Sequence, residues 1–180
     1  MKFCPECGNH VAYTVPPGDD RERHVCSQCD VIHYHNPKVI VGCIPEHEGR
    51  VLMCKRAIEP RYGYWTLPAG FMENQETSAE GAARETREEA AAEATELALY
   101  RVFDVPHINQ VYIFYRCGIV NGQYGVGPES LESDLLSEQQ IPWDELAFPV
   151  VRELLQAFFK DRHEGTFPVR HSIIRRPPRA

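Results

Sequence analysis

The segment that decides the fold is GFMENQETSAEGAARETREEAAA, residues 70–92. It is rich in Ala, Glu and Arg, which favour a helix over most of its length. With about 100° of rotation per residue, Glu88 and Glu89 fall on either side of Glu85, so three carboxylates share one stripe of this helix. Like charges at this spacing destabilise a helix unless cations occupy the stripe. Carboxylate oxygens are ligands that Mg2+ and Mn2+ prefer, so the sequence predicts a divalent-metal site here.

The charge of the whole chain is concentrated around this stripe. The 180 residues include 19 Lys and Arg against 26 Asp and Glu, a net charge of −7. Eight glutamates and two arginines lie between residues 73 and 96, so this segment alone has a net charge of −6. An acidic protein repels phosphate at long range, which argues against general nucleic-acid binding. A phosphorylated substrate would need a cation between itself and the protein.

The expected elements indicate an α/β sandwich. In chain order they are strands at 38–44 and 50–56, a loop at 57–77, a helix capped by Thr77 or Ser78 and reaching about Ala92, strands at 98–103 and 110–120, a loop at 121–128, and a helix at 149–159. No run of about 18 apolar residues occurs, so we expect no membrane span.

The N-terminal region has a different character. Cys4 and Cys7 form one C-x-x-C pair, Cys26 and Cys29 form a second, and 18 residues separate the pairs. Two such turns supply the four thiolates of a closed tetrahedral Zn2+ site, whereas a redox pair would not need a matched partner. Because the region is poor in aliphatic residues, the metal must supply its stability.

This pattern divides the chain into three parts. We expect a small zinc ribbon at residues 1–36, a larger domain at 37–162 and a basic tail at 163–180. The tail contains Arg170, Arg175, Arg176 and Arg179, and we expect it to dock on an acidic surface such as the partner subunit of a homodimer.

The seven cysteines also bear on the location of the protein. Their odd number, with no apolar leader at the N-terminus, favours a reducing, cytoplasmic setting over a disulfide framework. Cys43, Cys54 and Cys117 lie in apolar strand-like runs, where we expect buried thiols.

The charged positions of residues 70–92 match a known signature. Gly70, Glu76, the pair Arg84-Glu85 and the pair Glu88-Glu89 closely resemble the Nudix box, G-x5-E-x7-R-E-U-x-E-E-x-G-U. Thr86 and Ala91 depart from the pattern, at an aliphatic position and at the final glycine. The resemblance implies the Nudix α/β/α sandwich with a mixed sheet, and an enzyme that hydrolyses a nucleoside diphosphate joined to another moiety.

The resemblance also implies roles for single residues. Glu85, Glu88 and Glu89 would bind catalytic Mg2+ (or Mn2+), with the backbone carbonyl of Ala69 as a further ligand. Gly70 would let the loop approach the metals closely. From its place on the helix, Arg84 is expected to pair with Glu76 across the loop.

A general base is expected beyond the box, because many Nudix enzymes place a glutamate on a later loop. The segment Gly127-Pro-Glu-Ser-Leu-Glu132 offers Glu129 first and Glu132 second, as a metal ligand or as the base that takes the proton of water. We expect this loop to swing over the diphosphate. For Glu132, an ordinary exposed glutamate is an equally good interpretation.

Substrate-binding side chains are expected around the loop before the box. Arg56 and Arg61 flank it and are suited to clamp phosphate, although a surface role fits Arg61 as well. Tyr64 is a candidate for stacking on a flat ring. Trp65, Phe103 and Tyr112 are further candidates, but aromatic residues in strands belong more often to the core.

The combination of a four-cysteine ribbon and a Nudix domain resembles two groups. The zinc-ribbon Nudix hydrolases of plastids and bacteria act on FAD and ADP-ribose, giving AMP plus FMN or ribose 5-phosphate. The likeness covers His35-Asn-Pro-Lys38, Trp65-Thr-Leu-Pro-Ala-Gly70 and Gly127-Pro-Glu-Ser-Leu-Glu132, among other segments. The NADH pyrophosphatases are the alternative, but their Ser-Gln-Pro-Trp-Pro-Phe-Pro run is missing after the box.

An alternative of another class is a nucleotide-sensing or nucleic-acid-binding ribbon module. A sensor has no need to keep the three box glutamates, and the ribbon has more acidic than basic residues. We therefore expect a small-molecule nucleotide substrate and no nucleic-acid or membrane partner.

Overall fold

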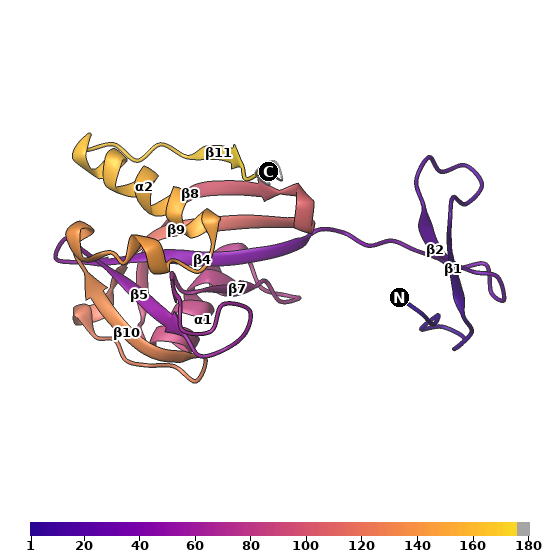
Figure 1. Ribbon diagram of the computed structural model, residues 1–180, viewed down its shortest axis with the longest axis horizontal. Coiled ribbons are helices and arrows are strands. Elements are labelled where there is room, and N and C mark those ends of the chain that lie inside the picture. The colour runs from indigo at the N-terminus through magenta and orange to yellow at the C-terminus, as the bar shows by residue number, and fades with distance from the viewer. Residues whose placement is uncertain (176–180) are drawn as a thin grey trace. The chain divides into compact units, whose positions relative to one another are not determined.

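The computed structural model describes residues 1–175; Arg176 and Arg179 of the expected basic tail lie outside this range. By its internal contacts the chain separates into two compact units, Met1–Pro37 and Lys38–Ala180 (Figure 1). Neither helix within residues 1–175 combines the length and apolar content needed to cross a bilayer.

The first unit is a small antiparallel sheet. Its strands are β1 (Val11–Thr14), β2 (Arg23–Cys26) and β3 (Ile32–His33), in the order β1-β2-β3. One tight turn precedes the sheet, where the amide of Gly8 donates to the carbonyl of Cys4. A second turn joins β2 to β3, where the amide of Cys26 donates to the carbonyl of Val31. These turns place the cysteine pairs at the same end of the unit.

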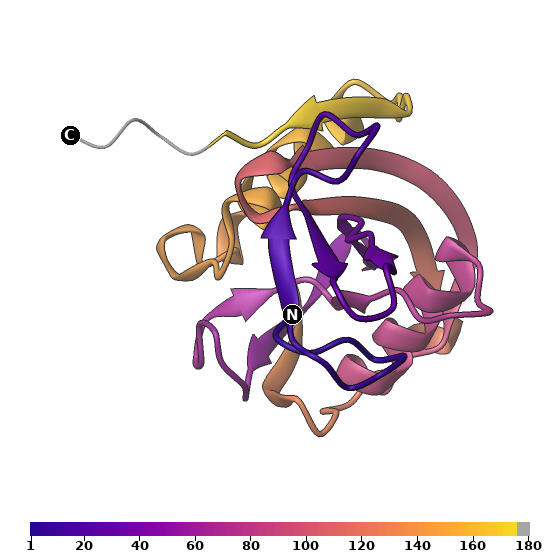
Figure 2. The ribbon, with the colours of Figure 1, turned by 90° about the vertical axis from the view of Figure 1, so that its right-hand side faces the viewer.

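The second unit is built on a mixed sheet with strand order β10-β5-β4-β9-β8-β11. The strands are β4 (Lys38–His47), β5 (Arg50–Arg56), β8 (Ala94–Val105), β9 (Gln110–Ile119), β10 (Ser130–Leu136) and β11 (Arg170–Ile173). β4 runs parallel to β9, and β8 runs parallel to β11, while the other neighbours are antiparallel. Figure 2 shows β8 and β9 side by side as long curved strands.

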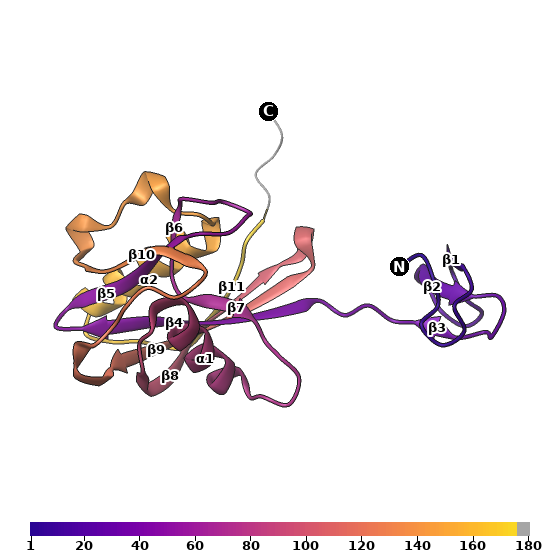
Figure 3. The same cartoon turned by 90° about the horizontal axis from the view of Figure 1, so that it is seen from below.

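Two helices cover the opposite faces of this sheet, α1 (Ser78–Ala90) and α2 (Pro149–His163) (Figures 1 and 3). Successive side chains of a strand point to opposite faces of the sheet, so alternate residues of β5 pack toward different helices. Val51 and Met53 join the core under α2, whereas Leu52 and Cys54 pack with the end of α1. This α/β/α sandwich confirms the predicted fold class.

Four short 3-10 turns complete the described structure: η1 (Pro106–Ile108), η2 (Val120–Gly122), η3 (Glu138–Gln140) and η4 (Trp143–Glu145). Cys43, Cys54 and Cys117 are buried, as predicted. Pro149 occupies the first turn of α2, where its missing amide hydrogen is not needed.

The prediction of an unstructured loop at 57–77 was wrong in part. β6 (Trp65–Thr66) pairs with β5, and β7 (Ala69–Phe71) pairs with β4. Strands of two or three residues have no periodic pattern to reveal them, and the Pro and Gly around them indicated a loop. The aromatic candidates Trp65 and Phe103 are buried in the core, so they do not stack on a substrate.

The expected basic tail also differs from the structure. Residues 170–173 form β11, which pairs in parallel with β8, and Ile174 is buried. Arg170 contacts buried Asp161 of α2 (Nη1 to Oδ1, 3.2 Å), and His171 contacts Asp104 (2.8 Å). This part of the tail therefore docks on acidic groups of its own domain, because backbone pairing at the sheet edge brings those groups within reach.

Candidate active site

Helix α1 begins and ends with well-satisfied backbone groups. Thr77 caps it: its hydroxyl accepts from the amide of Glu80, whose carboxylate accepts from the amide of Thr77 in return. The helix ends at Ala90, earlier than predicted, because Ala91 adopts a left-handed conformation with φ of 45°. This conformation suits the glycine that the Nudix box has at that position, and Ala91 adopts it without changing the helix before it.

The loop before α1 lies directly against the carboxylates of the helix. A Cβ atom on Gly70 would collide with the carboxylate of Glu85, so glycine at this position lets the Glu85 carboxylate lie directly against the loop. The amide of Ala69 donates to Oε2 of Glu89 at 3.2 Å. Because β7, which contains both loop residues, pairs with β4, the sheet fixes the loop relative to the helix.

Arg84 is the cation that occupies the acidic stripe. It contacts Glu76 through Nε (3.0 Å) and Nη2 (2.8 Å). Its Nη1 contacts both Glu85 (2.7 Å) and Glu88 (3.0 Å). The hydrogen bonds from Arg84 are the main reason that the pKa of Glu76 is lowered to about 2. The expected pairing of Arg84 with Glu76 is thus present and extends to two of the three stripe carboxylates.

The other stripe carboxylate, Glu89, has no arginine bonded to it within residues 1–175. Its side chain is only 6% exposed, and burial raises its pKa to about 8. Burial likewise raises the pKa of Glu85, although the hydrogen bond from Arg84 opposes the change. A buried carboxylate is costly to ionise without a nearby cation. The oxygen-only donor set and this unmet need for positive charge fit a divalent ion.

Glu129 is exposed, and its negative charge acts on the same carboxylates. Burial is the main cause of the raised pKa of Glu85 and Glu89, and the charge of Glu129 adds to it. The backbone carbonyl of Glu129 accepts from the amide of Ala57 at 2.8 Å, which fixes this part of the chain. Glu132 belongs to β10, opposite Lys55 (3.6 Å). The expectation of a swinging loop at 127–132 was therefore wrong for its second half.

Arg56 is the substrate-binding candidate that lies beside the stripe. It is 9% exposed, its guanidinium lies 5.2 Å from the ring centre of Phe148, and its charge acts on Glu89. Its Nε donates to the carbonyl of Pro60 at 2.9 Å. Arg61 and Tyr64 stack on each other, 5.5 Å from guanidinium to ring centre, on the exposed loop. The structure shows no contact of this pair with the box glutamates.

Sequence reasoning missed the residues that hold Glu129 in place. The amide of Gly125 donates to the carbonyl of Ala90 (2.7 Å), and the amide of Gly127 donates to the carbonyl of Glu89 (3.0 Å). These bonds satisfy carbonyls at the end of α1 that have no partner within the helix. The two glycines of Tyr124-Gly-Val-Gly-Pro128 were the available signal for such close backbone contact.

The four paired cysteines form a second metal-compatible group. Their sulfur atoms all lie within 4.8 Å of one another. The Cys4 and Cys29 sulfurs are 3.7 Å apart and those of Cys7 and Cys26 are 3.5 Å apart, near the roughly 3.8 Å expected for thiolates around tetrahedral zinc. Backbone and side-chain hydrogen bonds from Asn9 lower the pKa of Cys7 to about 6, favouring the thiolate.

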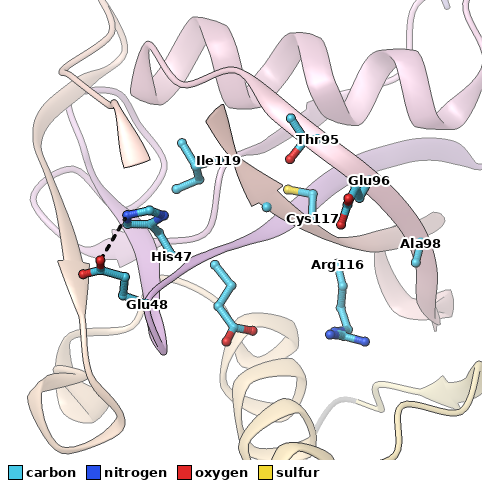
Figure 4. A pocket seen from close by; sticks show the side chains of 10 residues that line it. His47, Glu48, Thr95, Glu96, Ala98, Arg116, Cys117 and Ile119 are labelled. Carbon is cyan, nitrogen blue, oxygen red and sulfur yellow. Dashed lines mark ion pairs between the residues drawn. The ribbon is translucent and has the colours of Figure 1, made fainter. Parts of the chain in front are cut away.

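A cavity of about 520 Å³ lies elsewhere, where β4, β8 and β9 meet. His47, Glu48, Glu96 and Arg116 are among its lining residues (Figure 4). Its β4 residues are 46 and 47, whereas the loop of the box pairs with β4 at residues 40–42. The cavity therefore shares no residue with the acidic stripe.

Comparisons with known proteins agree with this geometry. A family model described as Nudix N-terminal, a zinc ribbon, matches residues 2–35, and the NUDIX domain model matches residues 36–161. The crystal structure of a NUDIX hydrolase from Nitrosomonas europaea is 51% identical, with a TM-score of 0.94 over 98% of this chain and 100% of that one.

Two curated relatives have named activities. The ADP-ribose pyrophosphatase of Methanocaldococcus jannaschii is 29% identical over 121 residues, covering 64% of this chain and 69% of the relative. The NAD-capped RNA hydrolase NudC of Vibrio vulnificus is 31% identical over 104 residues, covering 56% of this chain. The match spans only 36% of that hydrolase.

Proposed function

Because the chain belongs to the Nudix hydrolases, we propose that it cleaves the diphosphate linkage of ADP-ribose or FAD, giving AMP plus ribose 5-phosphate or FMN. The observation that carries the proposal is the arrangement of the box carboxylates: Arg84 bonds to both Glu85 and Glu88, Gly70 lies against Glu85, and Glu89 is buried beside the amide of Ala69. The negative charge of Glu129 acts on Glu85 and Glu89. Such a group suits metal-assisted hydrolysis, because a bridging cation can neutralise both the diphosphate and the protein.

Glu85, Glu88 and Glu89, with the carbonyl of Ala69, are the proposed ligands of Mg2+ or Mn2+. When bound, the ion supplies positive charge to the diphosphate and lowers the pKa of an attacking water. Arg84 keeps two hydrogen bonds to Glu76, which is not among these ligands. Glu76 would therefore keep Arg84 in place beside the helix when Glu85 and Glu88 bind a metal ion instead of Arg84.

Glu129 is the proposed base that takes the proton of the attacking water. Its charge acts on Glu85 and Glu89 although it lies outside their helix, which supports a separate role as the base for the attacking water. Arg56 is the proposed phosphate clamp. Of its three guanidinium nitrogens, only Nε is hydrogen-bonded within residues 1–175, so both terminal nitrogens remain for phosphate oxygens. Arg61 and Tyr64 are proposed to contact the rest of the substrate.

The choice of ADP-ribose rests on the named archaeal relative, and the choice of FAD rests on the motif resemblance of the whole chain. A second candidate is hydrolysis of NADH or NAD-capped RNA, which the match to the NudC hydrolases favours. The acidic ribbon argues against a long RNA contact, since phosphate binding needs Lys and Arg.

A product assay with Mg2+ or Mn2+ tests the proposal. ADP-ribose, FAD, NADH, a diadenosine polyphosphate and a short NAD-capped RNA are compared at equal concentration, and products are separated by chromatography. We expect AMP from ADP-ribose or FAD with the highest kcat/KM. A tenfold preference for NADH or the capped RNA would favour the second candidate, and no hydrolysis of any of them would contradict both.

For the ribbon, we propose one structural Zn2+ held by Cys4, Cys7, Cys26 and Cys29. The seven cysteines are unpaired, which supports a reducing, cytoplasmic setting as a further proposal. A homodimer is also proposed, and light scattering after gel filtration measures it directly: a mass near 41 kDa, twice the 20.6 kDa of one chain, is expected, and a mass near 20.6 kDa would contradict it.

A further inference from the structure

The segment before β10 packs backbone to backbone on the last turn of α1. Gly127 is buried, and a Cβ atom built on it would overlap the carbonyl oxygen of Glu88. Its amide donates to the carbonyl of Glu89 at 3.0 Å. A residue with any side chain would have to move away from the helix, so glycine is required for this contact.

This contact lies two residues before Glu129. The carbonyl of Gly127 accepts from the amide of Ser130 at 3.1 Å, which closes a tight turn around Glu129. On the other side, the carbonyl of Glu129 accepts from the amide of Ala57, at the end of β5. Two anchors, one on α1 and one next to β5, thus fix the backbone that holds the Glu129 side chain.

The sheet is irregular at the same place. Ser130 pairs with Arg56 and Glu132 pairs with Lys55, so Leu131 is an extra residue on β10. A bulge of this kind turns side chains near the end of a strand. Here it separates Glu129, whose backbone follows the contact with α1, from Glu132, which pairs with Lys55.

We propose that Gly127 is a positioning residue: it lets the 125–130 segment dock on the end of α1, so that Glu129 is held in fixed relation to Glu88 and Glu89. The inference rests on the proposed function, because it assigns Gly127 an effect on hydrolysis only through Glu129. In this arrangement the proposed base moves with the proposed metal ligands as one unit, and no loop closure is needed to bring it in.

The test is a double-mutant cycle of Gly127→Ala and Glu129→Gln, with ADP-ribose and FAD as substrates. Glu129→Gln is expected to lower kcat about 100-fold, as loss of a general base does. Gly127→Ala should lower kcat at least about tenfold with less than a twofold change in KM, because its clash is with the backbone at the end of α1 and the side chains of Arg56 and of the box are kept. The double variant should be no slower than Glu129→Gln, since Gly127 acts through the same group.

Gly125→Ala is the matched control in the same segment. A Cβ atom there would lie 3.3 Å from the methyl group of Ala91, which is tight but within reach of small adjustments. We expect near-normal kcat for this variant, because alanine keeps the backbone amide that Gly125 donates to Ala90. Hydrogen exchange supplies a readout independent of activity: the amides of Ala57, residue 127 and Ser130 should exchange faster in Gly127→Ala and not in Gly125→Ala.

Multiplicative loss in the double variant would overturn the proposal, as would unchanged exchange in Gly127→Ala. If Gly127→Ala does not fold, Ala57→Pro replaces it in the cycle, because it removes the amide that binds Glu129 while Arg56 stays in an extended strand. Wild-type activity of Glu129→Gln would refute the positioning role of Gly127, but it would remain consistent with metal-assisted hydrolysis by the box glutamates. Full activity in Glu88→Gln would instead contradict the proposed function itself.

Discussion

The guanidinium of Arg84 binds both carboxylate oxygens of Glu76, with Nε 3.0 Å from Oε2 and Nη2 2.8 Å from Oε1. Its remaining nitrogen, Nη1, joins Glu85 to Glu88. One arginine therefore connects the loop before α1 to the acidic stripe of the helix. Because the stripe holds like charges, this arginine stabilises the helix in the absence of any other cation.

Replacing Arg84 with Gln should destabilise the protein when divalent ions are removed. Several charge-assisted hydrogen bonds are lost at a mostly buried position, so we expect a loss of about 2 kcal/mol in the free energy of unfolding. Mg2+ should raise the melting temperature more in this variant than in the wild type, since it relieves greater repulsion. Urea denaturation with EDTA or Mg2+ measures both effects. Arg87→Gln is the control, because Arg87 is exposed on the same helix. Equal stability of the two variants in EDTA would contradict this role.

Replacing Glu88 or Glu89 with Gln should abolish hydrolysis while the fold is retained. The neutral amide is a poorer ligand for Mg2+, so a loss of at least about 100-fold in kcat/KM is expected. AMP release from ADP-ribose and FAD is the assay, and circular dichroism verifies the fold. Glu93→Gln, at an exposed position just beyond the helix, is the matched control. Full activity of both stripe variants with Mg2+ would contradict the proposed mechanism.

Asp161 is expected to make the folded protein less stable at acid pH. It is fully buried and accepts from Tyr100 (2.7 Å), Arg101 (2.8 Å) and Arg170 (3.2 Å). Burial acts to raise its pKa, but the hydrogen bond from Tyr100 and the positive charges of the arginines outweigh it, so the pKa is lowered. A carboxylate with a lowered pKa in the folded state stabilises the protein above its unfolded pKa of about 3.9. That contribution is lost as the pH falls through the folded value.

Asp161→Asn should therefore cost roughly 3 kcal/mol at neutral pH, because two buried or half-buried arginines lose their charged partner. The difference from wild type should shrink below about pH 4. Urea denaturation between pH 3 and pH 7 gives the comparison. Asp144→Asn, at an exposed position, should change stability little at any pH. A constant difference between Asp161→Asn and wild type across this range would show that the charge of Asp161 is not responsible.

Cys7→Ser should release zinc from the ribbon without affecting the larger unit. Three thiolates bind zinc more weakly than four, and the ribbon has few apolar residues to stabilise it otherwise. We expect about one zinc per chain in the wild type and a large loss in the variant, by elemental analysis. Limited proteolysis should cut residues 1–37 first. Cys54→Ser tests a thiol outside the cluster and should retain the zinc; an absence of zinc from the wild-type protein would refute the assignment.

The sequence by itself determined the parts that depend on local spacing. Thr77, the periodicity of residues 78–90 and the arginine-glutamate pattern predicted α1 and its stripe, because cap and stripe both lie within one helix. The two C-x-x-C pairs predicted the ribbon cluster in the same way, since each pair is a single turn. Hydrophobic runs predicted most of β4, β5 and β9, although not their order in the sheet.

Only the tertiary structure decided what surrounds the stripe. Burial of Glu85 and Glu89 depends on β7 and on the segment at 125–130, which arrive from distant parts of the chain. Strand β11 pairs with the edge strand β8, and Arg170 contacts Asp161. Neither partner can be recognised from the local sequence, and for that reason the arginine-rich composition indicated a tail. Backbone pairing between residues far apart in the chain determines these contacts, and no local pattern of side chains predicts that pairing.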